Sequence, residues 1–252
     1  IQWMLNSAWP DMFWQLYDWY LVPNGAFYGA RNANRKVNVA YDYADGRIVA
    51  VNDTASRLRG VTARVRVFDV GSRVLFAESR TLDVAAGGRQ EVLTLPAVAP
   101  PTMVYLVDAR LQGRDGALLA ANWYWLSAEP DVPDWERSEW YVTPTKRYAD
   151  LTALSRLPAA DLEVTHRFAP AEGGQAIHVT LENPGPRLAF FVELAVVGST
   201  SGRLAAPIFW DDNYLSLAPG ERREVHGTFP AHALPAGERP VFRYQGINVA
   251  GR

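Results

Sequence analysis

Two adjacent carboxylates, Asp211 and Asp212, followed by Asn213, form the part of this chain best suited to acid–base chemistry. Enzymatic cleavage of a glycosidic bond uses two carboxyl groups that flank the bond, ~5–5.5 Å apart when the configuration is retained and further apart when it is inverted. Neighbouring side chains on a strand point to opposite faces, so this pair is poorly placed to act on one substrate. We interpret both residues as a turn or strand-edge feature and predict no catalytic residue in this chain.

Histidine offers a second type of chemistry, because its ring nitrogens bind metals. The four histidines are His166, His178, His226 and His232, and none of their spacings is that of a helical metal site. His166 and His178 fall in different predicted strands, which leaves a two-histidine metal site as the alternative to ordinary strand residues. Gly173-Gly174 has the composition of a hairpin turn, and no nucleophile-elbow motif accompanies a serine. We predict neither a metal nor a cofactor.

Aromatic side chains could bind a sugar by stacking against the apolar face of its ring. The candidates are Trp123, Trp125, Trp135, Trp140 and Trp210. Most of them lie at or near the domain boundaries predicted below. We therefore favour a role in packing domains together over a role in sugar binding.

The overall composition excludes several classes of function. The chain has 252 residues, of which 48% are hydrophobic and 21% charged, as in a folded globular protein. A net charge of −2 gives no electrostatic basis for nucleic-acid or anionic-membrane partners, and no stretch approaches the ~20 apolar residues of a membrane span. Cysteine is absent, which excludes disulfides and thiolate metal sites but leaves the compartment open.

The first segment differs from the rest in its aromatic content. Four of the nine tryptophans fall within the first nineteen positions: Trp3, Trp9, Trp14 and Trp19. Residues 1–5 are predicted to form a short buried strand. Pro10 suits the first turn of a helix, which we predict over residues 11–21 and which Val22-Pro23-Asn24-Gly25 should end.

Apolar side chains occupy nearly every face of this predicted helix. Such a helix belongs inside a large protein, and we expect Trp14 to be one of its packing residues. The alternative is an aromatic arm packed on the sandwich that follows. We favour the interpretation that the helix packs against residues that lie upstream of Ile1 in the complete protein. The helix alone would expose more aromatic surface than monomers usually tolerate.

After Arg35 the pattern changes to the period of two that is typical of strands. Turn signals separate the strand candidates, which are 37–43, 47–52, 61–70, 74–82, 90–95, 103–111 and 118–126, and then 162–168, 176–182, 189–197, 214–217, 222–229 and 241–249. Seven short strands over about ninety residues are expected of an immunoglobulin-like sandwich. We predict one sandwich at 36–126, a linker at 127–158 and a second sandwich at 159–252.

The linker and an internal repeat support this division. The linker is rich in proline, and Trp135, Trp140 and Tyr141 predict that it is packed; residues 148–157 form a short helical candidate. Residues 82–92, LDVAAGGRQEV, align with residues 215–225, LSLAPGERREV. The repeat is short, and it favours two copies of one type of sandwich.

Three parts of the sequence resemble glycoside hydrolase family 2, in particular its exo-β-D-glucosaminidase and β-mannosidase-like group. Residues 2–10 (QWMLNSAWP), with 17–21 (YDWYL) and 25–30 (GAFYGA), resemble the end of the catalytic barrel. Residues 130–135 (PDVPDW), 140–144 (WYVTP) and 148–151 (YADL) resemble the linker of this group. Residues 209–213 (FWDDN) and 217–220 (LAPG) resemble its last domain.

The resemblance implies a retaining exo-acting enzyme with a (β/α)₈ barrel whose catalytic glutamates lie upstream of this chain. The fold is then mainly β: two immunoglobulin-like sandwiches preceded, at residues 1–35, by the last strand and helix of the barrel. Because barrel active sites lie at the carboxyl ends of the strands, the resemblance implies a substrate-binding role for Trp3, Asn6 and Trp9. For Trp3, packing in the barrel core is an equal alternative.

The implied partners are a β-glucosaminide or β-mannoside substrate and the upstream barrel and N-terminal domains of the same enzyme. We expect the complete enzyme to be secreted or periplasmic in a bacterium. Two other functions stay open, a carbohydrate-binding module and a purely structural pair of sandwiches. An aromatic strip on one open sheet face would favour the binding module. The aromatic segment at residues 1–35 argues against the purely structural pair.

Overall fold

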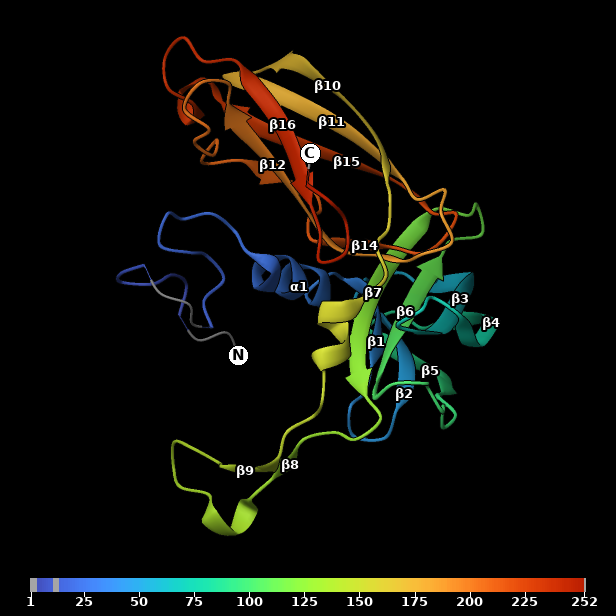
Figure 1. Ribbon diagram of the computed structural model, residues 1–252. Coiled ribbons are helices and arrows are strands. Elements are labelled where there is room, and N and C mark those ends of the chain that lie inside the picture. The colour runs from blue at the N-terminus through green and yellow to red at the C-terminus, as the bar shows by residue number, and fades with distance from the viewer. Residues whose placement is uncertain (1–3, 11–13, 252) are drawn as a thin grey trace. The chain divides into compact units, whose positions relative to one another are not determined.

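The computed structural model describes residues 4–10 and 14–251, and the predictions that concern residues 1–3, 11–13 and 252 lie outside it (Figure 1). Strands dominate the described chain. The contacts divide it into two compact units, Ile1–Arg31 together with Pro158–Arg252, and Asn32–Leu157. Each unit contains one antiparallel β-sandwich, which confirms the mainly β fold with two sandwiches.

The sandwich of residues 32–157 has seven strands in two sheets. The strands are β1 (Val37–Tyr41), β2 (Arg47–Asn52), β3 (Leu58–Asp69), β4 (Val74–Val84), β5 (Gly88–Thr94), β6 (Val104–Gln112) and β7 (Leu118–Ser127). One sheet has the order β1-β2-β5 and the other β4-β3-β6-β7. All of the pairings are antiparallel, and β1 pairs with β2 from Val37 opposite Asn52 to Tyr41 opposite Ile48.

The other sandwich also has seven strands in two sheets. They are β10 (Glu163–Ala171), β11 (Gly174–Glu182), β12 (Ala189–Gly198), β13 (Phe209–Trp210), β14 (Leu215–Leu217), β15 (Arg222–Pro230) and β16 (Pro240–Gln245), and a 3-10 turn, η3 (Ala231–Ala233), follows β15. The sheet orders are β10-β11-β15-β13 and β14-β12-β16. The two-residue strand β13 is missing from the sequence prediction, because it is too short to show alternation.

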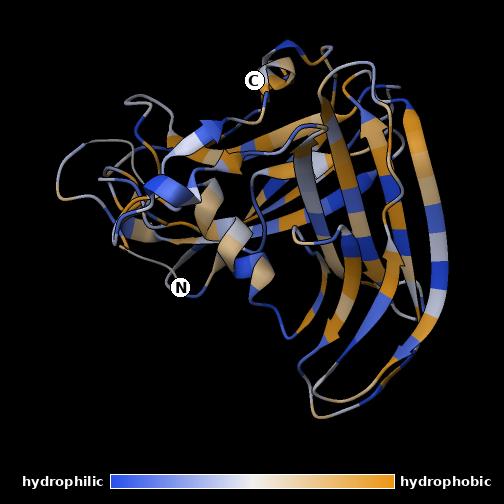
Figure 2. Cartoon of the chain, turned by 90° about the horizontal axis from the view of Figure 1, so that it is seen from below, coloured by the Kyte–Doolittle hydropathy of each residue, from blue (hydrophilic) through white to orange (hydrophobic). Residues whose placement is uncertain are grey.

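Alternating hydrophobicity explains how each sheet buries one face. Apolar and polar residues alternate along the strands in Figure 2. In β2, where residues 48–51 are all apolar, the burial itself alternates: Ile48 and Ala50 are fully buried while Val49 and Val51 on the other face are half-buried. Each sandwich has its own cluster of buried aliphatic and aromatic side chains, centred on Val65 and Val107 in one and on Ile177 and Leu217 in the other.

The internal repeat corresponds to the same turn in both sandwiches. Gly87 and Gly220 occupy equivalent positions and both have positive φ angles, 61° and 74°, which glycine adopts without strain. A buried asparagine supports each turn: Asn52 donates to the Val84 carbonyl at 3.3 Å, and Asn183 donates to the Leu217 carbonyl at 3.0 Å. Each sandwich therefore has the equivalent hydrogen bond from an asparagine side chain to the strand before the turn, which supports the interpretation of two copies of one sandwich type.

The helix predicted over residues 11–21 is wrong for the residues that the structure describes. Residues 14–21 are not helical, and the helix α1 instead runs from Gly25 to Ala33. Asn24, expected to help end a helix, begins one, since its Oδ1 accepts hydrogen bonds from the backbone N–H groups of Ala26 (2.9 Å) and Phe27 (3.2 Å). A Cβ at position 25 would lie 2.6 Å from the Phe191 ring, so any residue other than glycine there would force that ring to shift.

Substituting Asn24 tests this boundary. Asn24→Ala removes the cap of α1 and a side-chain bond to the Gln15 carbonyl (2.9 Å), and we expect a loss of about 0.5–2 kcal/mol in the free energy of unfolding. Asn24→Asp keeps the capping acceptor and should recover most of that loss. Urea denaturation of the chain measures both. Equal stability of Asn24→Ala and the unchanged chain would contradict the assigned start of α1.

The linker forms a small hairpin with little packing around it. It comprises β8 (Val132–Pro133), the 3-10 turn η1 (Trp135–Arg137), β9 (Thr145–Arg147) and a second 3-10 turn, η2 (Thr152–Arg156). The helical candidate at 148–157 is therefore a shorter 3-10 turn. Trp140 is 93% exposed and Trp135 is 72% exposed, so these aromatic residues do not pack against the described part of the chain, and the packed linker stays a prediction for the complete protein.

None of the helices in the described part of the chain has the length and apolar character needed to cross a membrane.

Candidate functional site

The N-terminal segment contains the three residues proposed to face substrate. Trp3 lies outside the described residues. Asn6 is half-buried and donates its Nδ2–H to the Ser7 carbonyl at 3.2 Å, and the Trp9 side chain is 65% exposed. Asn6 and Trp9 are three positions apart in the sequence. The exposed surface of the Trp9 ring could contact further groups.

Backbone hydrogen bonds hold this segment in an irregular conformation. The Tyr17 N–H donates to the Leu5 carbonyl at 2.9 Å, and the Asn24 N–H donates to the Leu16 carbonyl at 3.1 Å. These partners are far apart in the sequence, so the segment folds back on itself instead of forming a helix. Trp14 is 56% exposed on this chain, so the packing role expected for it in the complete protein stays a prediction that requires residues outside this chain.

An aromatic row fixes the segment and α1 to the sandwich of residues 158–252. The Tyr17 and Phe27 ring centroids are 5.2 Å apart, and Tyr28 lies 5.9 Å from Tyr214, which in turn lies 5.3 Å from Phe191. Tilted aromatic pairs at these distances stabilise beyond the area that they bury. The sequence prediction missed this anchor. A possible signal for it was the pair of aromatic residues, Phe27 and Tyr28, that closely follows the capping residue Asn24.

Polar groups complete the anchor. Asn213 accepts from the Leu194 N–H at 2.7 Å and donates to the Leu194 carbonyl at 3.0 Å, so its amide is fully oriented. The Tyr28 hydroxyl bonds to Asn213, and burial raises the pKa of Tyr28 to about 12. The Arg31 guanidinium donates to the Trp210 carbonyl at 2.7 Å.

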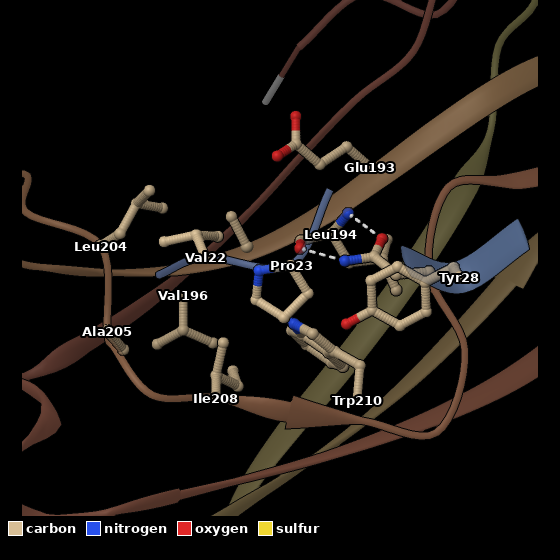
Figure 3. A pocket seen from close by; sticks show the side chains of 12 residues that line it. Val22, Pro23, Tyr28, Glu193, Leu194, Val196, Leu204, Ala205, Ile208 and Trp210 are labelled. Carbon is tan, nitrogen blue, oxygen red and sulfur yellow. Dashed lines mark hydrogen bonds between the residues drawn. The ribbon is translucent and has the colours of Figure 1, made fainter. Parts of the chain in front are cut away.

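The cavities beside this anchor are small. The pocket in Figure 3, lined by Val22, Pro23 and Tyr28 and by residues of β12, holds about 20 Å³, which is room for one water molecule. Burial and the Glu193 carboxylate, 3.1 Å from the Tyr214 hydroxyl, raise the pKa of Tyr214. A neighbouring cavity of about 210 Å³ is lined largely by apolar groups and by Arg31. Neither cavity contains a pair of carboxylates.

Asp211 and Asp212 are engaged by different partners. Asp211 accepts a bond from the His226 backbone N–H at 2.9 Å and lies 3.1 Å from His226 Nδ1. Asp212 accepts from the Arg223 guanidinium at 2.9 Å. Both residues follow the short edge strand β13, in agreement with the interpretation of a turn or strand-edge feature.

Three histidines, His166, His178 and His226, lie on two faces of one sheet, and His232 lies in the 3-10 turn η3. His178 is opposite Arg167 and His226 in the register, whereas His166 is opposite the buried Val179 and contacts the Phe242 ring at 4.9 Å. His166 and His178 therefore do not share a site. Burial lowers the pKa of His178, and Arg167 and His226 add to this effect. Among the described residues, no group of three or more potential ligands could hold a metal ion.

The tryptophan candidates have different environments. Trp210 is buried in a sandwich core, and Trp123 stacks on Phe68 at 5.9 Å. Trp125 is 39% exposed, and Trp135 and Trp140 are on the exposed linker hairpin. Trp123 and Trp125, two positions apart on β7, share one sheet face, but the other three tryptophans do not lie on it.

A groove of about 630 Å³ lies on the outer face of the sheet β1-β2-β5. Tyr41 and Tyr43 are its aromatic lining residues, and Val49 and Val51 are also in the lining. Arg47 bridges to Asp45 at 2.7 Å beside it. This groove is the feature most compatible with a binding module, although two tyrosines are fewer than a continuous aromatic strip.

Comparisons with known proteins define the class of both sandwiches. Residues 46–128 match the mannosidase Ig/CBM-like domain family, and residues 140–249 match the exo-β-D-glucosaminidase Ig-fold domain family. The fold is also similar to a β-D-mannosidase from Dictyoglomus thermophilum, with a TM-score of 0.62 and 14% identity over 98% of this chain and 26% of that chain. The chain is thus a pair of immunoglobulin-like domains of the type found in these glycosidases.

Matches over nearly the whole chain specify the group. Exo-β-D-glucosaminidases from Amycolatopsis orientalis and Streptomyces avermitilis are 36% and 37% identical to it over 99% of this chain, which spans 24% and 28% of their lengths. The exo-chitosanase of A. orientalis, in complex with PNP-β-D-glucosamine, has a TM-score of 0.92 and 33% identity, over 99% of this chain and 30% of that chain. The chain belongs to glycoside hydrolase family 2 and corresponds to the C-terminal portion of the exo-β-D-glucosaminidase group.

Proposed function

We propose that the complete protein is a retaining, exo-acting β-glycosidase that removes terminal β-linked D-glucosamine, and that this chain is its non-catalytic C-terminal part. One observation carries the proposal. The similarity to exo-β-D-glucosaminidases covers 99% of this chain at 36–37% identity, so it includes the aromatic N-terminal segment as well as both sandwiches. Generic immunoglobulin-like domains would match over the sandwiches alone.

In this proposal the domain boundaries follow the sequence pattern. Residues 1–35 are the last part of the (β/α)₈ barrel, residues 36–126 and 159–252 are the sandwich domains, and residues 127–158 are the linker. The exposed rings of Trp9, Trp14 and Trp19 support an upstream neighbour, because monomers rarely leave such aromatic clusters in water. The remaining barrel strands would cover them.

The residues of this chain would then contribute to binding and not to bond cleavage. The acid and the nucleophile are glutamates upstream, and Asp211 and Asp212 are held by His226 and Arg223. Trp3, Asn6 and Trp9 are proposed to line the subsite for the terminal sugar, since Trp3 to Asn6 would occupy the carboxyl end of the last barrel strand, with Trp9 nearby, and active sites form at that end of the barrel. An indole under the apolar face of the sugar excludes water and attracts a cationic amino group.

Substrate preference tests the proposal directly. We expect the complete protein to hydrolyse PNP-β-D-glucosamine with a higher kcat/KM than PNP-β-D-mannoside, measured as p-nitrophenol release. Analysis of the products from a chitosan oligosaccharide should show glucosamine as the first and only small product, which identifies exo cleavage. Preference for the mannoside would move the protein to the β-mannosidase-like branch, and activity on neither substrate would contradict the proposal.

A carbohydrate-binding module is the second candidate, and the groove beside Tyr41 and Tyr43 is the observation in its favour. In that case the 252-residue chain alone would bind soluble chitosan, and Tyr43→Ala would abolish the binding. Isothermal titration of the chain with chitosan oligosaccharides decides between the candidates. We expect no binding heat, because the proposed sugar subsite requires the upstream barrel.

A further inference from the structure

The linker hairpin, defined as residues 132–148, is held by hydrogen bonds within itself and exposes its large side chains. The Asp134 N–H donates to the Pro144 carbonyl at 2.7 Å, and the Glu139 N–H donates to the Val142 carbonyl at 2.8 Å. The hydroxyls of Ser138 and Thr143 lie 2.7 Å apart. In Figure 1 the hairpin, labelled β8 and β9, extends away from the strands β6 and β7 of its own unit. Polar bonds within the hairpin therefore set its conformation.

The large side chains of this hairpin are exposed to an unusual degree. The exposed fractions are 72% for Trp135, 93% for Trp140, 67% for Tyr141 and 77% for Tyr148. Lys146 and Glu136, 3.7 Å apart, lie among them and give the cluster a polar rim. Tryptophan and tyrosine anchors surrounded by charged residues are the typical composition of a protein–protein contact.

We propose that the linker hairpin docks on the part of the complete enzyme that lies upstream of this chain and that Trp135, Trp140, Tyr141 and Tyr148 are buried in that contact. The inference depends on the proposed function for the presence of this upstream part. Its partner is within the same polypeptide: the chain spans 24–30% of the length of its relatives, so most of the surface of such an enzyme is contributed by residues outside this chain.

The ring geometry favours protein over polysaccharide as the occupant. A sugar chain stacks on rings that present flat faces in succession. Trp140 and Tyr141 instead meet edge to face, with an interplanar angle of 69° and centroids 4.8 Å apart. A wedge of this shape fits a depression between protein side chains better than it fits an extended row of pyranose rings.

Fluorescence quenching by acrylamide provides the first test. The emission of Trp140 is obtained as the difference between each protein and its Trp140→Phe variant. We expect this emission to be quenched freely in the 252-residue chain and to be protected in the complete enzyme without added sugar. Equal quenching in both proteins would overturn the proposal. So would protection that appears only with chitosan or that rises with protein concentration, because these results identify a polysaccharide site or a contact between copies.

Paired stability measurements provide the second test. Trp140→Ala should lower the Tm of the complete enzyme by several degrees and leave the Tm of the 252-residue chain unchanged. The matched control is Tyr43→Ala. Tyr43 is 72% exposed and lies outside the hairpin in the same unit, so its loss should change the Tm of the chain and of the complete enzyme equally. A Trp140→Ala shift of equal size in both proteins would contradict docking. Neither readout requires activity, so a failure of the proposed glycosidase function would be seen separately in the p-nitrophenol assay.

Discussion

The purified 252-residue chain is expected to release no measurable aryl group from aryl β-glucosaminide or β-mannoside, while the complete protein turns over at rates ordinary for an enzyme. The two carboxyl groups of a retaining glycosidase each contribute orders of magnitude in rate. Asp211 and Asp212 cannot replace them, since each is engaged by its own basic partner. The measurement is aryl release at matched molar concentrations of chain and complete protein.

A turnover above ~1 per second by the chain alone would refute this expectation, because that rate is typical of real enzymes. The matched variants are Asp211→Asn and Asp212→Asn in the complete protein. Each should leave kcat unchanged within the error of the assay. A large fall in kcat, with Tm unchanged, would place the catalytic carboxylate in this chain and contradict both the prediction and the proposed role of the sandwiches.

Trp3→Ala in the complete enzyme is expected to lower kcat/KM by about ten- to several-hundredfold. Each ~1.4 kcal/mol of lost transition-state stabilisation costs a factor of ten. Stacking under the terminal sugar, together with a cation–π attraction of ~0.5–2 kcal/mol for an amino sugar, gives a loss of this size. Trp3→Phe should recover part of the activity, because it keeps an aromatic face. Steady-state kinetics on PNP-β-D-glucosamine measures both variants.

Trp14→Ala is the comparison for Trp3. Trp14 is 56% exposed on this chain, and in the complete enzyme we expect upstream residues to cover it. Its loss should then reduce thermal stability, by ~3–5 kcal/mol if it becomes fully buried, more than it reduces kcat/KM. If Trp3→Ala lowers the Tm and leaves kcat/KM unchanged, Trp3 is a core residue and the subsite assignment is wrong.

The strands of both sandwiches were predictable because burial of one sheet face imposes a period of two on the sequence. β2 has the predicted bounds, Arg47–Asn52, and most other strands differ by a few residues at their ends. The short strand β13 was not predictable in this way. Its two residues, Phe209 and Trp210, pair with β15 at an edge where no alternation can develop.

The N-terminal segment shows where local sequence signals are ambiguous. Pro23 and Gly25 are common after the end of a helix, but Asn24 between them is equally suited to begin one. Tertiary contacts decide the outcome, because α1 must place Tyr28 beside Tyr214, 186 positions further along the chain. The proposed sugar-facing residues were identified from a resemblance, and the catalytic groups that they would serve are not among the described residues.

The grouping of residues 1–31 with residues 158–252 has a consequence for synthesis on the ribosome. The intervening unit, residues 32–157, is continuous and can fold as soon as it leaves the exit tunnel. Helix α1 emerges earlier but finds Trp210 and Tyr214 only after nearly the whole chain has been made. Within this chain, the aromatic segment that precedes residue 32 is therefore made well before its partners in residues 158–252.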